Sequence, residues 1–160
     1  MIVRIQAAEA AIDDADAERD RRRAVTHGWV SVGFDPGGDK RTALNRLAYR
    51  AERAFAKALG VELRRDPDGF RAPDVAGYSV RFASRPGYGL VIHNRDGPYP
   101  YALVCATADP LTFEIVGTLG RAAALELRAG GIGMALPGTT DAWVIPREYV
   151  AATGSNPEGT

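Results

Sequence analysis

The sequence predicts one α/β domain with a mixed, largely antiparallel central sheet flanked by helices. An apolar stripe of helical period runs from residue 42 to residue 59, and several short apolar segments of strand length follow it. Most of these segments are joined by short turns rich in Gly, Pro and Asp, and short connections favour antiparallel neighbours. A chain of 160 residues is long enough to bury a core without disulfides.

An N-terminal helical extension is expected over residues 1–39. It begins with a short strand at 2–5, and a helix then runs from Ala7 to about Val25. Acidic residues gather near the start of this helix and arginines near its end, which complements the helix dipole. The apolar face is mostly alanine, so we expect the helix to pack at the periphery. The stretch from His27 to Asp39 contains DPGGD and is predicted to be a loop.

The best amphipathic helix opens the core, residues 40–152. Thr42 is its expected N-cap, and Gly60 follows its last residue, Leu59. Glu52 lies roughly 90° from the centre of the apolar stripe, at the edge of the buried face. The positions three and four residues from Glu52 hold no cation, so the helix itself offers this carboxylate no ion pair.

The remaining elements follow from turn signals and alternation. Ala76-Gly77 is expected to turn the chain tightly before a half-buried strand at 78–83. The continuous apolar run at 101–106 predicts a central strand buried on both faces. Further strands are expected at 61–65, 88–93, 111–116 and 142–145, short helices at 121–127 and 146–150, and a disordered tail at 153–160.

The composition and net charge of the chain exclude several classes of protein. No apolar run approaches the roughly 20 residues of a membrane helix, and the N-terminus lacks a signal-peptide layout, so we expect a soluble, cytoplasmic protein without membrane contact. The single cysteine, Cys105, excludes an internal disulfide framework and a cysteine-rich zinc site. The net charge of zero argues against a surface that coats nucleic acid generally.

Positive charge is concentrated in the middle of the chain. Residues 40–95 carry 12 basic and 5 acidic side chains, whereas residues 1–39 carry 5 and 8 and residues 96–160 carry 3 and 7. If these cations converge, they form a field that attracts phosphates, and the candidate nucleic-acid contacts are Arg46, Arg50 and Arg85. The alternative is a set of solvated arginines scattered around the fold.

Four residues form the candidate site: Glu52, Asp74, Ser79 and Arg81. Side chains alternate along a strand, so Ser79 and Arg81 share a face, and the aspartate before the turn can stand beside them. Two carboxylates suit a hard divalent cation, and a cation near a phosphate offsets the charge that develops there. The alternatives are a turn-capping role for Asp74 and an ion pair of Arg81 with Glu52 or Asp74.

An ordered series of segments carries a family resemblance. They read ERAFAKALGV (52–61), PDV (73–75), YSVRFA (78–83), LVIHNRD (90–96), YALVCA (101–106), FEIVG (113–117) and WVIP (143–146). In order and spacing the series resembles the PD-(D/E)XK nuclease-like superfamily, and in particular small phage and bacterial members of it. The resemblance covers residues 52–146 and implies a single nuclease-like domain over residues 1–152 with a restriction-endonuclease-like core.

The resemblance also implies roles for the four site residues. Asp74 is placed as the metal-binding aspartate and Glu52 as a second, helical carboxylate, with Mg²⁺ or Mn²⁺ as the cofactor. Ser79 takes the place of the family's Asp or Glu, and Arg81 that of its lysine. Serine brings no charge, and arginine stays protonated, so both positions depart from the catalytic pattern.

The function expected from this resemblance is that of a nuclease-like domain. It would act on or bind nucleic acid, with divalent-metal-dependent hydrolysis of phosphodiesters as the enzymatic form. The alternative is a catalytically inactive nuclease-fold module that binds a protein or nucleic-acid partner.

Overall fold

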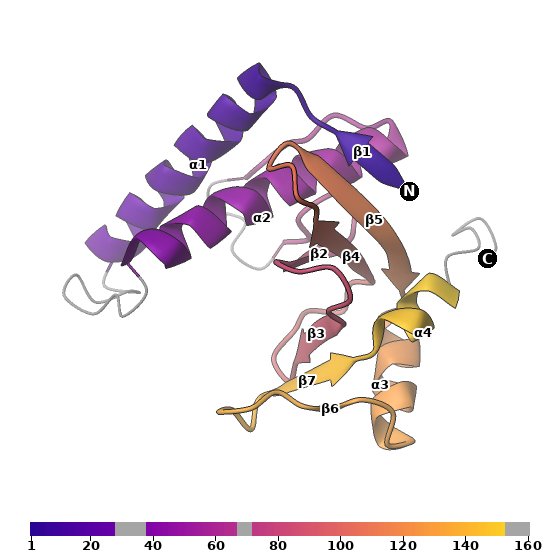
Figure 1. Ribbon diagram of the computed structural model, residues 1–160. Helices are drawn as coiled ribbons and strands as arrows, with labels where there is room; N and C mark the ends of the chain where they lie inside the picture. The colour runs from indigo at the N-terminus through magenta and orange to yellow at the C-terminus, as the bar shows by residue number, and fades with distance from the viewer. Residues whose placement is uncertain (28–37, 67–71, 153–160) are drawn as a thin grey trace.

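The structure is a computed structural model that describes residues 1–27, 38–66 and 72–152 (Figure 1). The described residues form four helices and seven strands. In chain order these are β1 (Ile2–Arg4), α1 (Ala7–Thr26), α2 (Gly38–Leu59), β2 (Ser79–Ala83), β3 (Leu90–His93), β4 (Tyr101–Ala106), β5 (Thr112–Leu119), α3 (Arg121–Ala129), β6 (Met134–Ala135), β7 (Ala142–Ile145) and α4 (Arg147–Ala152).

The strands form two sheets. The main sheet has the order β1-β5-β4-β2, in which β1, β5 and β4 are antiparallel neighbours and β2 runs parallel to β4. The smaller sheet has the order β3-β7-β6 and is antiparallel throughout. The mixed, largely antiparallel α/β class is therefore confirmed, although the strands divide between two sheets.

The predicted run of antiparallel neighbours is wrong at one point. Strand β3 leaves the main sheet and pairs with β7, so the next neighbour of β2 is β4. The chain returns through residues 94–100 to the start of β2, where Tyr101 is in register with Ser79. This parallel pairing brings residues 94–100 to the same end of the sheet as the candidate site.

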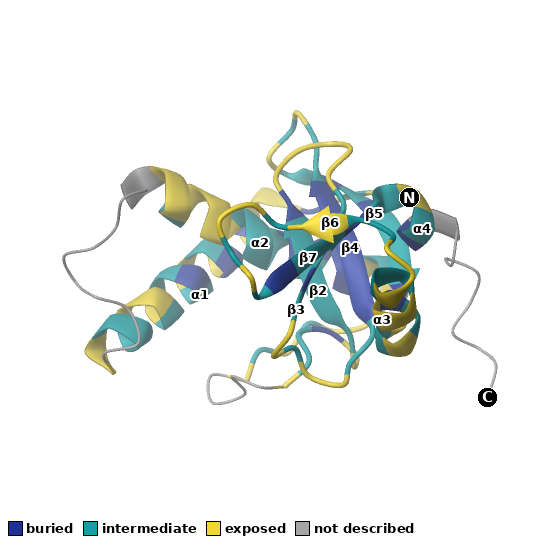
Figure 2. Ribbon diagram, turned by 90° about the horizontal axis from the view of Figure 1, so that it is seen from below, coloured by how far each residue is buried: buried dark blue, intermediate teal, exposed yellow. Residues whose placement is uncertain are grey.

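Strand β4 separates two apolar cores, as its continuous apolar sequence predicts. Ala102 and Val104 face α2, where Phe55 is 2% exposed. Tyr101, Leu103 and Cys105 face the smaller sheet and α3, a second core that includes Leu90, Ile92 and Ile145. Figure 2 shows β4 as the buried centre of the molecule. Burying a side chain of the size of Phe55 contributes about 1.5–3 kcal/mol.

Helix α1 lies against α2 on the side of the main sheet away from α3 (Figure 1). Only two apolar residues of α1, Ala10 and Ala17, are fully buried, so the helix packs at the periphery as expected. Its carboxylates make much of the contact: Glu9 binds Lys57 at 2.9 Å and Asp14 binds Arg50 at 2.7 Å. Part of the positive charge of residues 40–95 is therefore neutralised inside the fold.

Several element boundaries differ from the sequence prediction. Helix α2 begins at Gly38, so Thr42 is an interior helical residue and not the N-cap. Residues 61–65 form no strand. The predicted loop at 27–39 and the predicted tail at 153–160 lie largely or wholly outside the described residues.

Strand β6 was not predicted, because Met134–Ala135 is too short to show alternation. The turn before it depends on Gly133, whose φ is +88°. A Cβ at this position would lie 2.1 Å from the carbonyl oxygen of Val144 on β7, so only glycine fits this close approach.

Candidate functional site

A tight turn places Asp74 beside β2. Val75 and Tyr78 form an isolated antiparallel bridge, and the two residues between them have positive φ, +48° at Ala76 and +86° at Gly77. Asp74 Oδ2 then accepts the backbone N–H of Val80 at 2.7 Å. The predicted turn at 76–77 is confirmed, and its effect is to hold Asp74 against the start of the strand.

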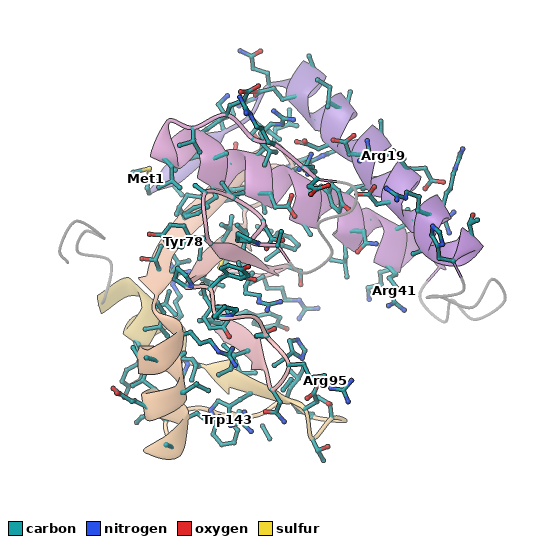
Figure 3. The ribbon with its side chains drawn as sticks, turned by 180° about the vertical axis from the view of Figure 1, so that it is seen from behind. Met1, Arg19, Arg41, Tyr78, Arg95 and Trp143 are labelled. Atoms are coloured by element: carbon teal, nitrogen blue, oxygen red, sulfur yellow. The ribbon has the colours of Figure 1, made fainter. Side chains whose placement is uncertain are left out.

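Tyr78 fixes this turn to α2. Its ring meets the Phe55 ring edge-on, with 5.4 Å between the centroids. Figure 3 labels Tyr78 next to helix α2. The turn, β2 and α2 are therefore packed together through aromatic contacts, and this packing brings Asp74 into the electrostatic neighbourhood of Glu52.

Glu52 has an ion-pair partner that the sequence did not reveal. Its Oε2 accepts Nε of Arg65 at 2.9 Å. The same guanidinium donates to Asp13 at 2.8 Å, to Asp16 at 3.1 Å and to the carbonyl oxygen of Tyr49 at 2.6 Å. Arg65 lies 13 residues after Glu52, in a segment without regular structure, so helical spacing gave no signal for this pair.

The two carboxylates of the site both have raised pKa values. Burial raises the pKa of Glu52 to about 7; the nearby Asp74 carboxylate acts in the same direction, and Arg65 opposes both. Burial also raises the pKa of Asp74, against the Val80 N–H and the charge of Arg81, which lower it. Glu52, Asp74, Ser79 and Arg81 therefore belong to one electrostatic cluster that spans α2, the turn and β2.

Arg81 pairs with Asp96, and not with Glu52 or Asp74 as the ion-pair alternative expected. Among the described residues, Asp96 is the guanidinium's one hydrogen-bond partner, through Nη2. Nε of Arg81 is buried without an acceptor in the described part of the chain. A buried N–H without an acceptor costs about 1–3 kcal/mol. The side chain as a whole remains 26% exposed.

Asp96 lies at the centre of a hydrogen-bonded chain. Its Oδ2 accepts the backbone N–H of His93 at 2.7 Å and the hydroxyl of Tyr101 at 3.0 Å. That hydroxyl in turn accepts Nη1 of Arg121 at 2.8 Å. The guanidinium carbon of Arg81 lies 5.6 Å from the centroid of the Tyr101 ring. Asp96 gave no sequence signal beyond its place after an apolar strand.

The three arginines expected to contact nucleic acid differ in environment. Arg50 donates two hydrogen bonds to Asp14 and one to the carbonyl oxygen of Pro110, so its charge is used to hold α1. Arg46 and Arg85 are exposed. The guanidinium carbon of Arg85 lies 5.9 Å from the centroid of the Tyr88 ring.

The donor set does not fit a divalent cation as arranged. The two carboxylates predicted to hold Mg²⁺ or Mn²⁺ are Glu52 and Asp74, but Glu52 binds Arg65, and Oδ2 of Asp74 accepts the backbone N–H of Val80. Within the described ranges, no three His, Cys, Asp or Glu side chains group so that they could hold a metal ion. Ser79 adds no charge to the set.

Comparisons with protein-family models, curated proteins and solved structures find no match for this chain. In the part of the chain that the structure describes, no helix is both long enough and apolar enough to span a membrane.

Proposed function

We propose that this chain is a nuclease-like domain that binds nucleic acid through phosphate contacts at the cluster of Glu52, Asp74, Ser79 and Arg81. The observation that carries the proposal is the convergence of these residues, since the resemblance required one cluster from a helix, a turn and a strand. The effect of Asp74 on the pKa of Glu52, and that of Arg81 on the pKa of Asp74, support that convergence.

Arg81 supplies the main phosphate contact. Its guanidinium is partly exposed and donates one hydrogen bond to a described residue, so further N–H groups remain for a ligand. Guanidinium groups match the geometry of phosphate oxygens and stay charged at all accessible pH values. Arg46 and Arg85 are exposed and are the further candidates for contacts with the nucleic-acid backbone.

The two carboxylates tune the charge around this contact. With a pKa of about 7, Glu52 is protonated on the acidic side of neutrality, which removes a negative charge from the cluster. A phosphate is then repelled less, so we expect tighter binding below pH 7 than above it.

Binding without metal-dependent cleavage is the form that the donor set favours. The neutral Ser79 and the Glu52–Arg65 pair leave too few uncommitted ligands for a hard cation. No hydrolytic step is therefore assigned to these residues, and the inactive nuclease-fold module of the sequence analysis becomes the leading hypothesis.

The test measures binding and cleavage on the same oligonucleotides. Fluorescence anisotropy with labelled single- and double-stranded DNA and RNA is expected to show binding that persists in EDTA. Binding that does not weaken with added salt would point to a protein partner instead, and no binding to any of the four probes would refute the proposal. Cleavage in Mg²⁺ or Mn²⁺ that is lost in Asp74→Ala would contradict a binding-only role.

A further inference from the structure

Resting on the function proposed above, we propose that Asp96 is a positioning residue for Arg81, holding its guanidinium so that the remaining N–H groups receive a phosphate oxygen. Asp96 ends the segment LVIHNRD (90–96), to which the family resemblance assigns no role in the site. The parallel pairing of β2 with β4 brings that segment to the start of β2.

The carboxylate of Asp96 is itself held in place from two sides. The backbone N–H of His93 and the hydroxyl of Tyr101 both donate to Oδ2, which leaves Oδ1 for Arg81. Tyr101 is 1% exposed, and its hydroxyl is fixed by Arg121. The side chain of Asp96 is 11% exposed, so its orientation is set by the fold.

The orientation of Arg81 does not maximise its own hydrogen bonding. Its Nε is buried without an acceptor among the described residues, while Nη2 is bound to Asp96. An orientation that leaves one donor unsatisfied requires a contact that enforces it, and Asp96 and the Tyr101 ring are the contacts present. This is the arrangement expected of a guanidinium held ready for a ligand.

Positioning and simple electrostatics predict opposite results for the same substitution. Asp96→Asn removes a negative charge close to the phosphate contact, so charge alone predicts tighter binding of a polyanion. The amide has one accepting oxygen where the carboxylate has two, so it cannot accept both from Arg81, which binds Oδ1, and from the backbone N–H of His93, which binds Oδ2. If Asp96 positions Arg81, the substitution weakens binding.

The first measurement is the dissociation constant of an oligonucleotide at low salt. Asp96→Asn is expected to weaken binding about fivefold to tenfold, and the double variant with Arg81→Gln is expected to bind like Arg81→Gln alone. The matched control is Asp141→Asn, an exposed aspartate 3.9 Å from His93, which is expected to bind as wild type or slightly tighter. Equal or tighter binding by Asp96→Asn would overturn the inference.

The second measurement needs no nucleic acid. The ¹H–¹⁵N signal of the Arg81 side chain is followed while inorganic phosphate is added. It is expected to shift in the wild type and not in Asp96→Asn, and a wild-type signal unmoved by tens of millimolar phosphate would overturn the inference. A phosphate response in a protein that binds no oligonucleotide would refute the proposed function but support the positioning role, with a small phosphorylated molecule as ligand.

A second variant covers the case in which Asp96→Asn does not fold. Tyr101→Phe keeps the buried ring and removes only the hydroxyl that binds Asp96. It is expected to weaken the phosphate response in the same direction, and a full wild-type response would count against the proposal.

Discussion

Asp13 and Arg65 form an ion pair of 2.8 Å between the middle of α1 and the segment that follows α2. Asp13 is completely buried, and Arg53 takes both of its oxygens at 2.8–3.0 Å. Through Arg65 the same network reaches Glu52, which belongs to the candidate site. The N-terminal helix is therefore linked to the site through charge, although its own apolar face is small.

Asp13→Asn is predicted to destabilise the protein by about 3–5 kcal/mol, because it removes the buried charge that Arg53 and Arg65 share and leaves Arg53 without its carboxylate partner. The measurement is the free energy of unfolding in urea. Glu62→Gln is the control, since Glu62 pairs with Arg64 at the surface with side chains 74% and 85% exposed, and its loss is expected to cost less than about 1 kcal/mol. Equal effects of the two substitutions would argue against a buried network.

Glu52 is predicted to make the protein less stable as the pH rises. Its pKa is about 7 in the folded protein and 4.5 as the reference value, so the folded state binds more protons between these values and loses stability as pH increases through them. A pKa shift of that size corresponds to a loss of folding stability of about 3 kcal/mol at most. The loss is complete once the pH is well above 7.

The difference between wild type and Glu52→Gln isolates this contribution. Unfolding free energies of both proteins are measured from pH 4 to pH 8, where Glu9, Glu18 and Glu114 titrate alike in the two. We expect the free energy of unfolding of Glu52→Gln to increase relative to that of the wild type as the pH rises. A difference that does not change with pH would contradict the raised pKa.

Ala76→Gly is predicted to stabilise the protein. Ala76 has φ of +48°, a conformation that costs an L-residue about 1 kcal/mol relative to glycine. The control is Ala72→Gly in the exposed segment just before the turn, where φ is not positive and the extra freedom of glycine is expected to destabilise. A thermal unfolding series that ranks both variants below the wild type would refute the strain at Ala76.

Restoring the family pattern is predicted to create a cation site. Ser79→Glu places a second carboxylate beside Asp74, and Arg81→Lys removes the planar guanidinium next to it. The double variant is expected to bind Mn²⁺ by calorimetry and to be stabilised by it, whereas the wild type is not. If neither protein responds to Mn²⁺, the correspondence of Ser79 and Arg81 with the family positions would be wrong.

Local signals in the sequence predicted the elements more reliably than their partners. The spacing of apolar residues identified α2, the continuous run identified β4 as central, and Ala76-Gly77 identified the turn. Each of these features depends on residues that are adjacent or one helical turn apart. The parallel register of β2 with β4 depends on where β3 goes, and no local pattern records that.

In the candidate site, too, the sequence predicted positions better than long-range partners. Glu52 and Asp74 were expected near one another, and the Asp74 carboxylate contributes to the raised pKa of Glu52. The ion pairs made by Glu52 and Arg81 were missed, because Arg65 and Asp96 lie on irregular segments where spacing carries no information. Arg50 was expected to contact nucleic acid, but it binds Asp14 on α1. The acidic residues of α1 had a local explanation as complements of the helix dipole, so their spacing did not indicate this pair.

The most direct test of the proposed function is the salt dependence of nucleic-acid affinity in wild type and Arg81→Gln. If Arg81 contacts a phosphate, the slope of log K against log salt falls in magnitude by about 0.7–0.9 in Arg81→Gln. Arg4→Gln, on β1 at the opposite edge of the main sheet with its side chain 71% exposed, is expected to keep the wild-type slope. Identical slopes for wild type and Arg81→Gln would contradict the assignment of this site to phosphate binding.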